Sequence, residues 1–223
     1  MTSRPASTGG IAGGRWALAA ALCVMHLLGC TSVYYSAMEK LGREKRHILK
    51  SRVEASRGDQ EEVQEEFKTT FELFKEVTHY DGGDLERFYS RMQDQLERSD
   101  SKAEDVRERI RSIEQVAGDL FEEWSAEIGE ISRADLRRQS ESQLRTTRAR
   151  YERMIAAMKR AEARMDPVLT AFRDQVLFLK HNLNASAIAS LERSTVDIED
   201  DVAALIRDLQ DSIAETEEFL RTL

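Results

Sequence analysis

The chain has 223 residues with a formal net charge of −8 at pH 7, and 33% of its residues are charged. Only two prolines and 11 glycines argue against a turn-rich β protein, while a hydrophobic share of 41% argues against a disordered chain. An acidic chain also repels nucleic acid, so we exclude nucleic acid as a partner. Long amphipathic helices fit what remains.

The first predicted element is an export signal. Residues 1–15 contain two arginines and no acidic residue, and an apolar run then extends from Trp16 to Leu28, broken only by His26. These 13 residues are fewer than the roughly 20 that cross a bilayer. They match the apolar region of a secretory signal peptide instead.

The apolar run ends in Leu28-Gly29-Cys30, a small residue before a cysteine, as at the cleavage sites of bacterial lipoproteins. We therefore predict a signal peptide over 1–29, lipidation of Cys30, and an anchor with a short linker over 30–35. Acyl chains on Cys30 hold a protein firmly on a membrane. Thr31 stands where an aspartate commonly retains lipoproteins in the inner membrane, so we expect the periplasmic face of the outer membrane.

Residues 36–223 are predicted to form an elongated antiparallel bundle, or coiled coil, of about four long helices. Apolar residues recur every three or four positions through this region, and short turns between long helices make neighbours antiparallel. The clearest stripe comprises Ala103, Val106, Ile110, Ile113, Ala117, Leu120 and Trp124. We interpret the tryptophan as a large core residue.

The helix boundaries follow from capping residues and glycines. Pro167 lies inside the third helix, where the apolar phase continues from Met158 to Phe172; this predicts a kinked, continuous helix, with a fifth helix starting after Asp166 as the alternative. The expected boundaries are a capping box at Ser36 and Glu39, a glycine turn over 79–84, a second capping box at Ser132 and Asp135, and a break over 180–184 with Asn184 capping the helix from Ala185.

Opposite charges favour the pairing of the last two helices. Residues 133–164 hold ten basic and four acidic residues, whereas residues 192–218 hold ten acidic residues and two arginines. Exposed ion pairs contribute only a few tenths of a kcal/mol each, so we expect burial to stabilise the bundle and the charges to select the pairing.

Four stretches carry a family resemblance: YYSAMEKLG over 34–42 with EKR over 44–46, DGGDL over 81–85, LFEEW over 120–124, and 165–185, which begins with MDPVL and ends with LKHNLNA. They resemble the domain-of-unknown-function 2959 family of Gram-negative envelope lipoproteins. The resemblance covers essentially all of the chain after the predicted signal. It implies an exported, lipidated, helical protein of a family without an assigned activity, and it supplies no catalytic residues.

No motif in the sequence predicts an enzyme. Ser99 and Lys102 match the Ser-x-x-Lys of serine acylases, but the companion motifs of those enzymes are absent. Two Glu-x-x-His pairs end at His47 and His79, both on the first predicted helix and about 48 Å apart, so they cannot share one di-iron site. We therefore expect no catalytic residue, no resident metal and no cofactor.

Two groups of side chains on the first helix have alternative interpretations. Phe67, Phe71 and Phe74 follow helical spacing, which favours plain core over the lining of a ligand pocket. The segment 40–52 carries six basic residues and one acidic residue, which suits either a solvated face or anionic lipid headgroups. The candidate membrane-surface residues are Tyr34, Tyr35, Arg43, Lys45 and Arg46.

The membrane-distal tip is the candidate partner site, because the first and third turns of an antiparallel bundle lie at the same end. Ordinary turn chemistry explains the same residue types, and binding of a divalent cation through two histidines and an aspartate is a further alternative. The tip residues are His79, Asp81, Asp84, His181, Asn182 and Asn184.

These patterns predict a non-enzymatic, membrane-anchored periplasmic lipoprotein with a structural or protein-interaction role. The membrane, reached through lipid on Cys30, and a protein in the envelope are the expected partners, and self-association is compatible with a helical bundle. The alternative is a periplasmic binding module that captures a metal ion or small ligand at the membrane-distal turns.

Overall fold

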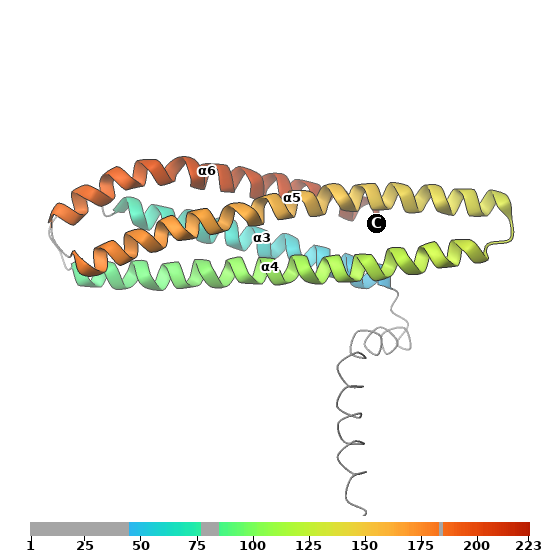
Figure 1. Cartoon of the computed structure of the whole chain (residues 1–223), viewed down its shortest axis with the longest axis horizontal. Coiled ribbons are helices and arrows are strands. Elements are labelled where there is room, and N and C mark those ends of the chain that lie inside the picture. Colours follow the sequence, from blue (N-terminus) through green and yellow to red (C-terminus); the bar gives the residue numbers. More distant parts are fainter. Residues whose placement is uncertain (1–44, 77–84, 183–184) are drawn as a thin grey trace, which may run out of the picture. The chain divides into compact units, whose positions relative to one another are not determined.

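The computed structural model describes residues 45–76, 85–182 and 185–223. They contain four helices: α3 (Lys45–Glu76), α4 (Leu85–Glu130), α5 (Ala134–His181) and α6 (Ala185–Thr222). Residues 46–223 form one compact unit, the helical bundle, in which these helices lie side by side (Figure 1). The predicted all-α bundle of four long helices is therefore confirmed. The expected start at Ser36 and the turn over 79–84 lie outside the described residues.

Ion pairs between the helices show that consecutive helices are antiparallel, as expected. For each pair of consecutive helices, the paired residue with the higher number on one helix meets the residue with the lower number on the other. The basic stretch 133–164 pairs with the acidic α6 in the same way, which confirms the pairing that the charges predicted. The pairs are Asp59–Arg109 and Glu62–Lys102 between α3 and α4, Asp100–Arg173 and Glu114–Lys159 between α4 and α5, and Arg153–Glu215 and Arg164–Asp208 between α5 and α6.

The Phe172 cluster, made of Phe67, Phe74 and Phe172, forms a fully apolar part of the core between α3 and α5. The ring centroids of Phe74 and Phe172 lie 4.8 Å apart with an angle of 14° between the ring planes, and Phe67 lies 6.3 Å from Phe172. Each of the three side chains is at most 1% exposed. Because Phe71 is also buried, the aromatic stripe of α3 is core and does not line a pocket.

A polar layer interrupts this core between α3 and α4. The hydroxyl oxygens of Thr70 and Ser99 lie 2.7 Å apart, and both side chains are fully buried. The amide of Gln95 donates to Thr70 Oγ1 at 3.2 Å and to a carboxylate oxygen of Glu66 at 2.6 Å. Each hydroxyl also donates within its own helix, Thr70 Oγ1 to the Glu66 carbonyl oxygen at 2.8 Å and Ser99 Oγ to the Gln95 carbonyl oxygen at 3.2 Å. Sliding α3 against α4 would break the contacts between the two helices, so the layer favours one register.

Three sequence predictions about α5 and the start of α6 agree with the structure, and one differs. The helix continues through Pro167, which excludes the five-helix alternative, and it ends at His181 with Asn182 as the C-cap; α6 begins at Ala185, as expected. The N-cap is Arg133, without a side-chain cap hydrogen bond. The predicted capping box is therefore wrong at this boundary.

The reason for that difference is a competing ion pair in the turn. The guanidinium of Arg133 donates to a carboxylate oxygen of Asp135 at 2.6 Å and holds the pKa of Asp135 below its ordinary value. That carboxylate therefore does not serve as the acidic partner of a capping box.

None of the described helices is both long enough and apolar enough to cross a membrane.

Candidate functional site

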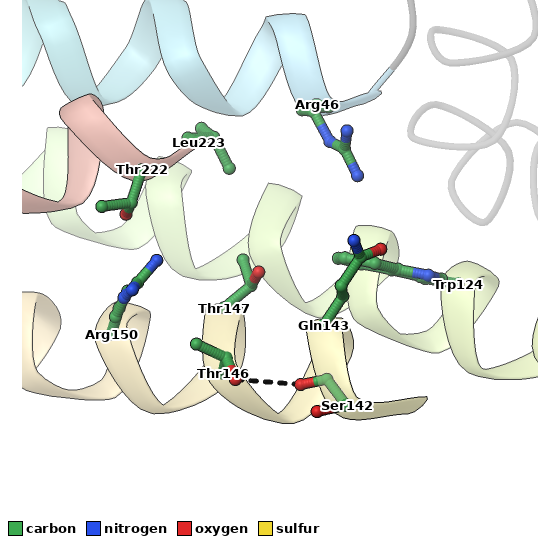
Figure 2. Close-up of a pocket in the computed structure, with 9 residues that line it drawn as sticks. All are labelled: Arg46, Trp124, Ser142, Gln143, Thr146, Thr147, Arg150, Thr222 and Leu223. Carbon is green, nitrogen blue, oxygen red and sulfur yellow. Dashed lines mark hydrogen bonds between the residues drawn. The ribbon is translucent and has the colours of Figure 1, made fainter. Parts of the chain in front are cut away.

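The Trp124 pocket is a polar cavity of about 340 Å³ formed by all four described helices. It lies between the first turn of α3, the last part of α4, the first part of α5 and the end of α6 (Figure 2). All of its lining residues belong to the helical bundle. They are Arg46, Trp124, Ser142, Gln143, Thr146, Thr147, Arg150, Thr222 and Leu223.

Trp124 forms one wall of the pocket and is half-buried. Its indole Nε1–H donates to Ser140 Oγ at 3.0 Å, which fixes the plane of the ring. The guanidinium carbon of Arg46 lies 5.2 Å from the ring centroid, a cation–π geometry. The expectation of an ordinary core residue is therefore wrong, because Trp124 meets a polar partner and a cation where a core tryptophan would meet apolar side chains.

Hydroxyl and amide groups form the rest of the lining. Thr146 Oγ1 donates to the Ser142 carbonyl oxygen at 2.9 Å, and Thr222 Oγ1 donates to the Phe219 carbonyl oxygen at 2.9 Å. These two hydroxyls have thus used their hydrogens on backbone carbonyls. Figure 2 shows Gln143 and Thr147 on the side of α5 that faces Arg46.

The charge of the pocket is positive. Arg46 and Arg150 line it, and neither has a carboxylate within ion-pair distance in the described part of the chain. The nearby Glu218 is paired with Arg221, which lowers its pKa, and the longer-range attraction of Arg150 and Arg153 adds to this effect. Among the side chains that line the pocket, two are therefore cationic and the others are neutral, a set that suits an anion.

A second hollow lies between α4 and α5 and has a volume of about 660 Å³. Arg148 covers the ring of Phe121 at 5.2 Å, and Tyr151 packs edge-on against Phe121 with the centroids 5.4 Å apart. Glu122 and Glu152 also line it, so its charges are mixed. This hollow presents no cluster of one charge and is a weaker candidate than the Trp124 pocket.

The structure describes two of the six predicted tip residues. His181 is exposed at the end of α5, and Asn182 donates from its side-chain amide to the Phe178 carbonyl oxygen at 2.9 Å. The others, His79, Asp81, Asp84 and Asn184, lie outside the described residues. Among the described residues, no group of three potential metal ligands occurs.

Two exposed apolar side chains, Leu177 and Phe178, lie a few residues before the described tip residues in the sequence. Leu177 is 54% exposed and Phe178 is 38% exposed, near the end of α5, and Val196 on α6 is 68% exposed. The fourth large hydrophobic residue that is exposed among the described residues, Leu136, lies at the opposite end of α5. These positions interrupt the polar surface that the sequence pattern predicted for outward-facing residues.

Of the predicted membrane-surface residues, Arg46 and Lys45 are described. Lys45 is the first residue of α3, and Arg46 is exposed and contributes to the Trp124 pocket. Cys30, Tyr34, Tyr35 and Arg43 lie outside the described residues. Farther along the same segment, Arg52 donates to the Ser112 carbonyl oxygen at 3.0 Å, so this cation is used between α3 and α4.

The Ser-x-x-Lys match does not form a site in the structure. Ser99 is fully buried in the polar layer, while Lys102 donates to a Glu62 carboxylate oxygen at 2.6 Å on the surface. The Glu62 carboxylate raises the pKa of Lys102, whereas a lysine that acts as a general base needs a lowered pKa. The two side chains therefore serve packing and surface pairing.

Sequence reasoning missed most of the Trp124 pocket. Arg46 and Trp124 were singled out for other roles, and Thr147 was a polar residue on the otherwise apolar stripe of α5. The sequence features that could have indicated the pocket were Trp124 at the end of the apolar stripe of α4 and Thr147 in the apolar stripe of α5. The convergence of α3, α4, α5 and α6 at this point was not readable from any one helix.

Comparisons with known proteins give one match, to a family model. No curated protein and no solved structure matches the chain. A family model described as "Protein of unknown function (DUF2959)" matches residues 34–223, which include every described residue. On this match, the chain belongs to the DUF2959 family of proteins of unknown function.

Proposed function

We propose that the protein is a non-enzymatic lipoprotein of the cell envelope, held by lipid on Cys30 at the periplasmic face of the outer membrane. The apolar run before Leu28-Gly29-Cys30 supports the anchor. The family match begins at residue 34, after this segment, which is consistent with a leader separate from the family domain. In this proposal the helical bundle has a structural or protein-docking role.

The exposed pair Leu177 and Phe178 is the observation that carries the docking role. Ser56 of α3 contacts Met158 of α5, and farther along both helices Phe74 stacks on Phe172, so α3 and α5 run in the same direction. The end of α5 and the first turn of α3 therefore lie at different ends of the bundle (Figure 1). The 32 residues of α3 separate the two ends by about 48 Å.

Exposed apolar side chains at the end remote from the anchor suit a protein partner, because their burial on docking removes apolar surface from water. The partner in this proposal is a periplasmic or envelope protein that reaches the bundle at His181. The bundle then acts as a spacer between the outer membrane and that protein.

The anchor is tested by mass spectrometry of the purified protein and by fractionation of a Cys30→Ala variant. We expect the mature chain to begin at an acylated Cys30 and the variant to leave the membrane fraction. An intact N-terminus, or unchanged membrane association of the variant, contradicts the anchor.

The docking role is tested by cross-linking in intact cells, followed by mass spectrometry of the cross-linked species. Leu177→Ser/Phe178→Ser should remove a defined cross-link, while the matched control Leu136→Ser, at the other end of α5, should keep it. Both variants should keep the parental melting temperature, because the changed side chains are exposed. Equal cross-linking in the parent and both variants contradicts docking at this end.

The alternative function is capture of a metal ion or small ligand at the membrane-distal turns. It depends on His79 together with His181, and the former lies outside the described residues. A melting temperature that rises with added Zn²⁺ in the parent, and not in His79→Ala/His181→Ala, would favour metal capture. Loss of the cross-link in that variant without a Zn²⁺ effect would favour docking.

A further inference from the structure

We propose that the Trp124 pocket binds a phosphate group, with Arg46 and Arg150 as its cationic donors. The two guanidinium groups come from different helices, α3 and α5, and both line the same cavity. Two like charges at one cavity repel each other, and neither is neutralised by a carboxylate at ion-pair distance in the described part of the chain. An anion in the pocket relieves this repulsion.

The neutral lining favours phosphate over a simple halide. Phosphate has several oxygens that accept hydrogen bonds, and guanidinium groups donate to them in a planar fork. Gln143, Ser142 and Thr147 add amide and hydroxyl groups from α5. Figure 2 shows Arg46 on α3 beside Trp124 and Gln143, and Arg150 on α5 at the other side of the pocket, near Thr222.

The size and walls of the pocket indicate that the phosphate carries an organic substituent. The volume of about 340 Å³ is in the range of small-molecule sites, roughly 300–1,000 Å³. Trp124 and Leu223 give the cavity an apolar wall beside its cationic groups. A phosphodiester headgroup of an anionic lipid and a soluble phosphate ester share this chemistry.

The position of Arg46 makes the lipid source the natural one. It lies 16 residues after Cys30 in the sequence, a separation that an extended chain spans within about 58 Å. If Cys30 is the anchor, the chain length sets this upper limit on the distance between the anchor and Arg46. This lipid source rests on the proposed function, whereas phosphate binding itself does not.

Tryptophan fluorescence provides a direct readout. Trp16 and Trp124 are the two tryptophans of the chain, so the full chain with Trp16→Phe reports on Trp124 alone. In non-ionic detergent, titration with inorganic phosphate should change this fluorescence saturably as Arg46 shifts from the indole ring toward the anion. Sodium chloride at the same ionic strength should not. Absence of a saturable change with both inorganic phosphate and the soluble lipid dihexanoylphosphatidylglycerol overturns the proposal.

A charge-matched pair of variants separates the pocket from diffuse surface charge. Arg46→Gln/Arg150→Gln removes two positive charges from the pocket, and Arg137→Gln/Arg138→Gln removes two exposed positive charges outside it. Losing charge-assisted hydrogen bonds should raise the half-saturating concentration at least about tenfold in the first variant. The second should stay within about twofold of the parent. Equal weakening in both variants overturns the proposal.

A folding control keeps this result interpretable. Circular dichroism should give both double variants a helical content equal to that of the parent. If Arg46→Gln/Arg150→Gln loses helix, Thr147→Val replaces it, because this change removes one pocket hydroxyl at nearly constant volume and charge. Weaker binding in Thr147→Val supports the site, and parental binding by this variant overturns the placement of the anion.

The source of the phosphate is resolved with a soluble lipid. Dihexanoylphosphatidylglycerol carries one anionic phosphodiester, and dihexanoylphosphatidylcholine carries a zwitterionic headgroup of similar size. Tighter binding of the former than of inorganic phosphate supports a lipid headgroup, and the reverse order supports a soluble phosphate. Because both lipids contain a phosphodiester, 1,2-dihexanoylglycerol, which has the same acyl chains and no phosphate, is the negative control, and binding of this control as tight as that of dihexanoylphosphatidylglycerol overturns phosphate recognition. These titrations need neither acylation of Cys30 nor a protein partner, so their outcome is independent of the anchor and docking tests.

Discussion

Phe172 on α5 and Trp124 on α4 each belong to the apolar stripe of a long helix, yet their surroundings differ. Phe172 is fully buried between Phe67 and Phe74 of α3. Trp124 is half-buried, covered by the guanidinium of Arg46 and hydrogen-bonded to Ser140. The same periodicity thus produces a dry aromatic cluster in one region and a cationic polar cavity in another.

The difference shows what an apolar stripe guarantees. It guarantees that a side chain points toward the neighbouring helices, since every third or fourth residue lies on one face. It does not determine what those neighbours supply. At Phe172 they supply aromatic rings, whereas at Trp124 they supply arginine, glutamine and hydroxyl side chains.

The largest expected effect is at the Phe172 cluster. Phe172→Ala removes a fully buried ring and leaves a cavity that rigid helices fill poorly, so the free energy of unfolding should fall by about 3–5 kcal/mol. Trp124→Ala should cost clearly less, although its ring is larger, because it is half-buried. Urea unfolding followed by circular dichroism measures both. An equal loss in the two variants would show that the two regions are packed alike.

Pro167 tests how strongly the packing of α5 overrides local preference. The proline has no N–H to donate to the Ala163 carbonyl oxygen, and α5 nevertheless continues through it. Because Pro167 is exposed, Pro167→Ala should restore that hydrogen bond without disturbing the core and raise stability by about 1–3 kcal/mol.

The control for this prediction is Asp174→Ala, an exposed change on the same helix, which should leave the melting temperature within a degree or two of the parent. A lower melting temperature for Pro167→Ala than for this control would mean that the proline ring itself stabilises α5 at this point.

The polar layer tests whether the core near the Phe172 cluster tolerates polarity only in matched pairs. Thr70→Val should cost about 1–2 kcal/mol, since it deprives buried Ser99 and Gln95 of a hydrogen-bond partner. Adding Ser99→Ala should cost less than its single effect predicts, because the contact between Thr70 and Ser99 is already lost in Thr70→Val. Additive losses in a double-mutant cycle would contradict coupling between Thr70 and Ser99.

The smallest expected effect is a pH dependence near the Trp124 end. Burial raises the pKa of Tyr151, and the negative charges of Glu114 and Glu152 add to this effect. The unfolded chain therefore releases this proton near the ordinary tyrosine pKa of about 10, while the folded chain retains it. The contribution of Tyr151 is complete below pH 10 and is lost as the pH rises above that value.

Melting temperatures between pH 8 and pH 11 check this prediction against Tyr151→Phe, which cannot titrate. The parent should lose more stability than the variant above pH 10, and the two should follow parallel curves below it. Parallel curves over the whole range would show that Tyr151 is well solvated in the folded protein.

Much of the fold was predictable because it depends on local patterns. The stripe from Ala103 to Leu120 is buried throughout, and the break at 180–184 correctly precedes the helix that begins at Ala185. The capping box at Ser132 failed because Asp135 binds the side chain of Arg133. A short sequence motif shows which capping hydrogen bonds can form. It does not show whether they are more stable than an ion pair in the same turn.

The sequence by itself determined that residues after the predicted leader form long amphipathic helices, with α5 and α6 complementary in charge. Both properties repeat within single helices, so a linear pattern contains them. Only the tertiary structure decided that Ser99 and Lys102 are separated between core and surface, and that Arg46, Trp124 and Arg150 meet at one cavity. Those outcomes depend on the lateral packing of helices from distant parts of the chain, which no single stripe encodes.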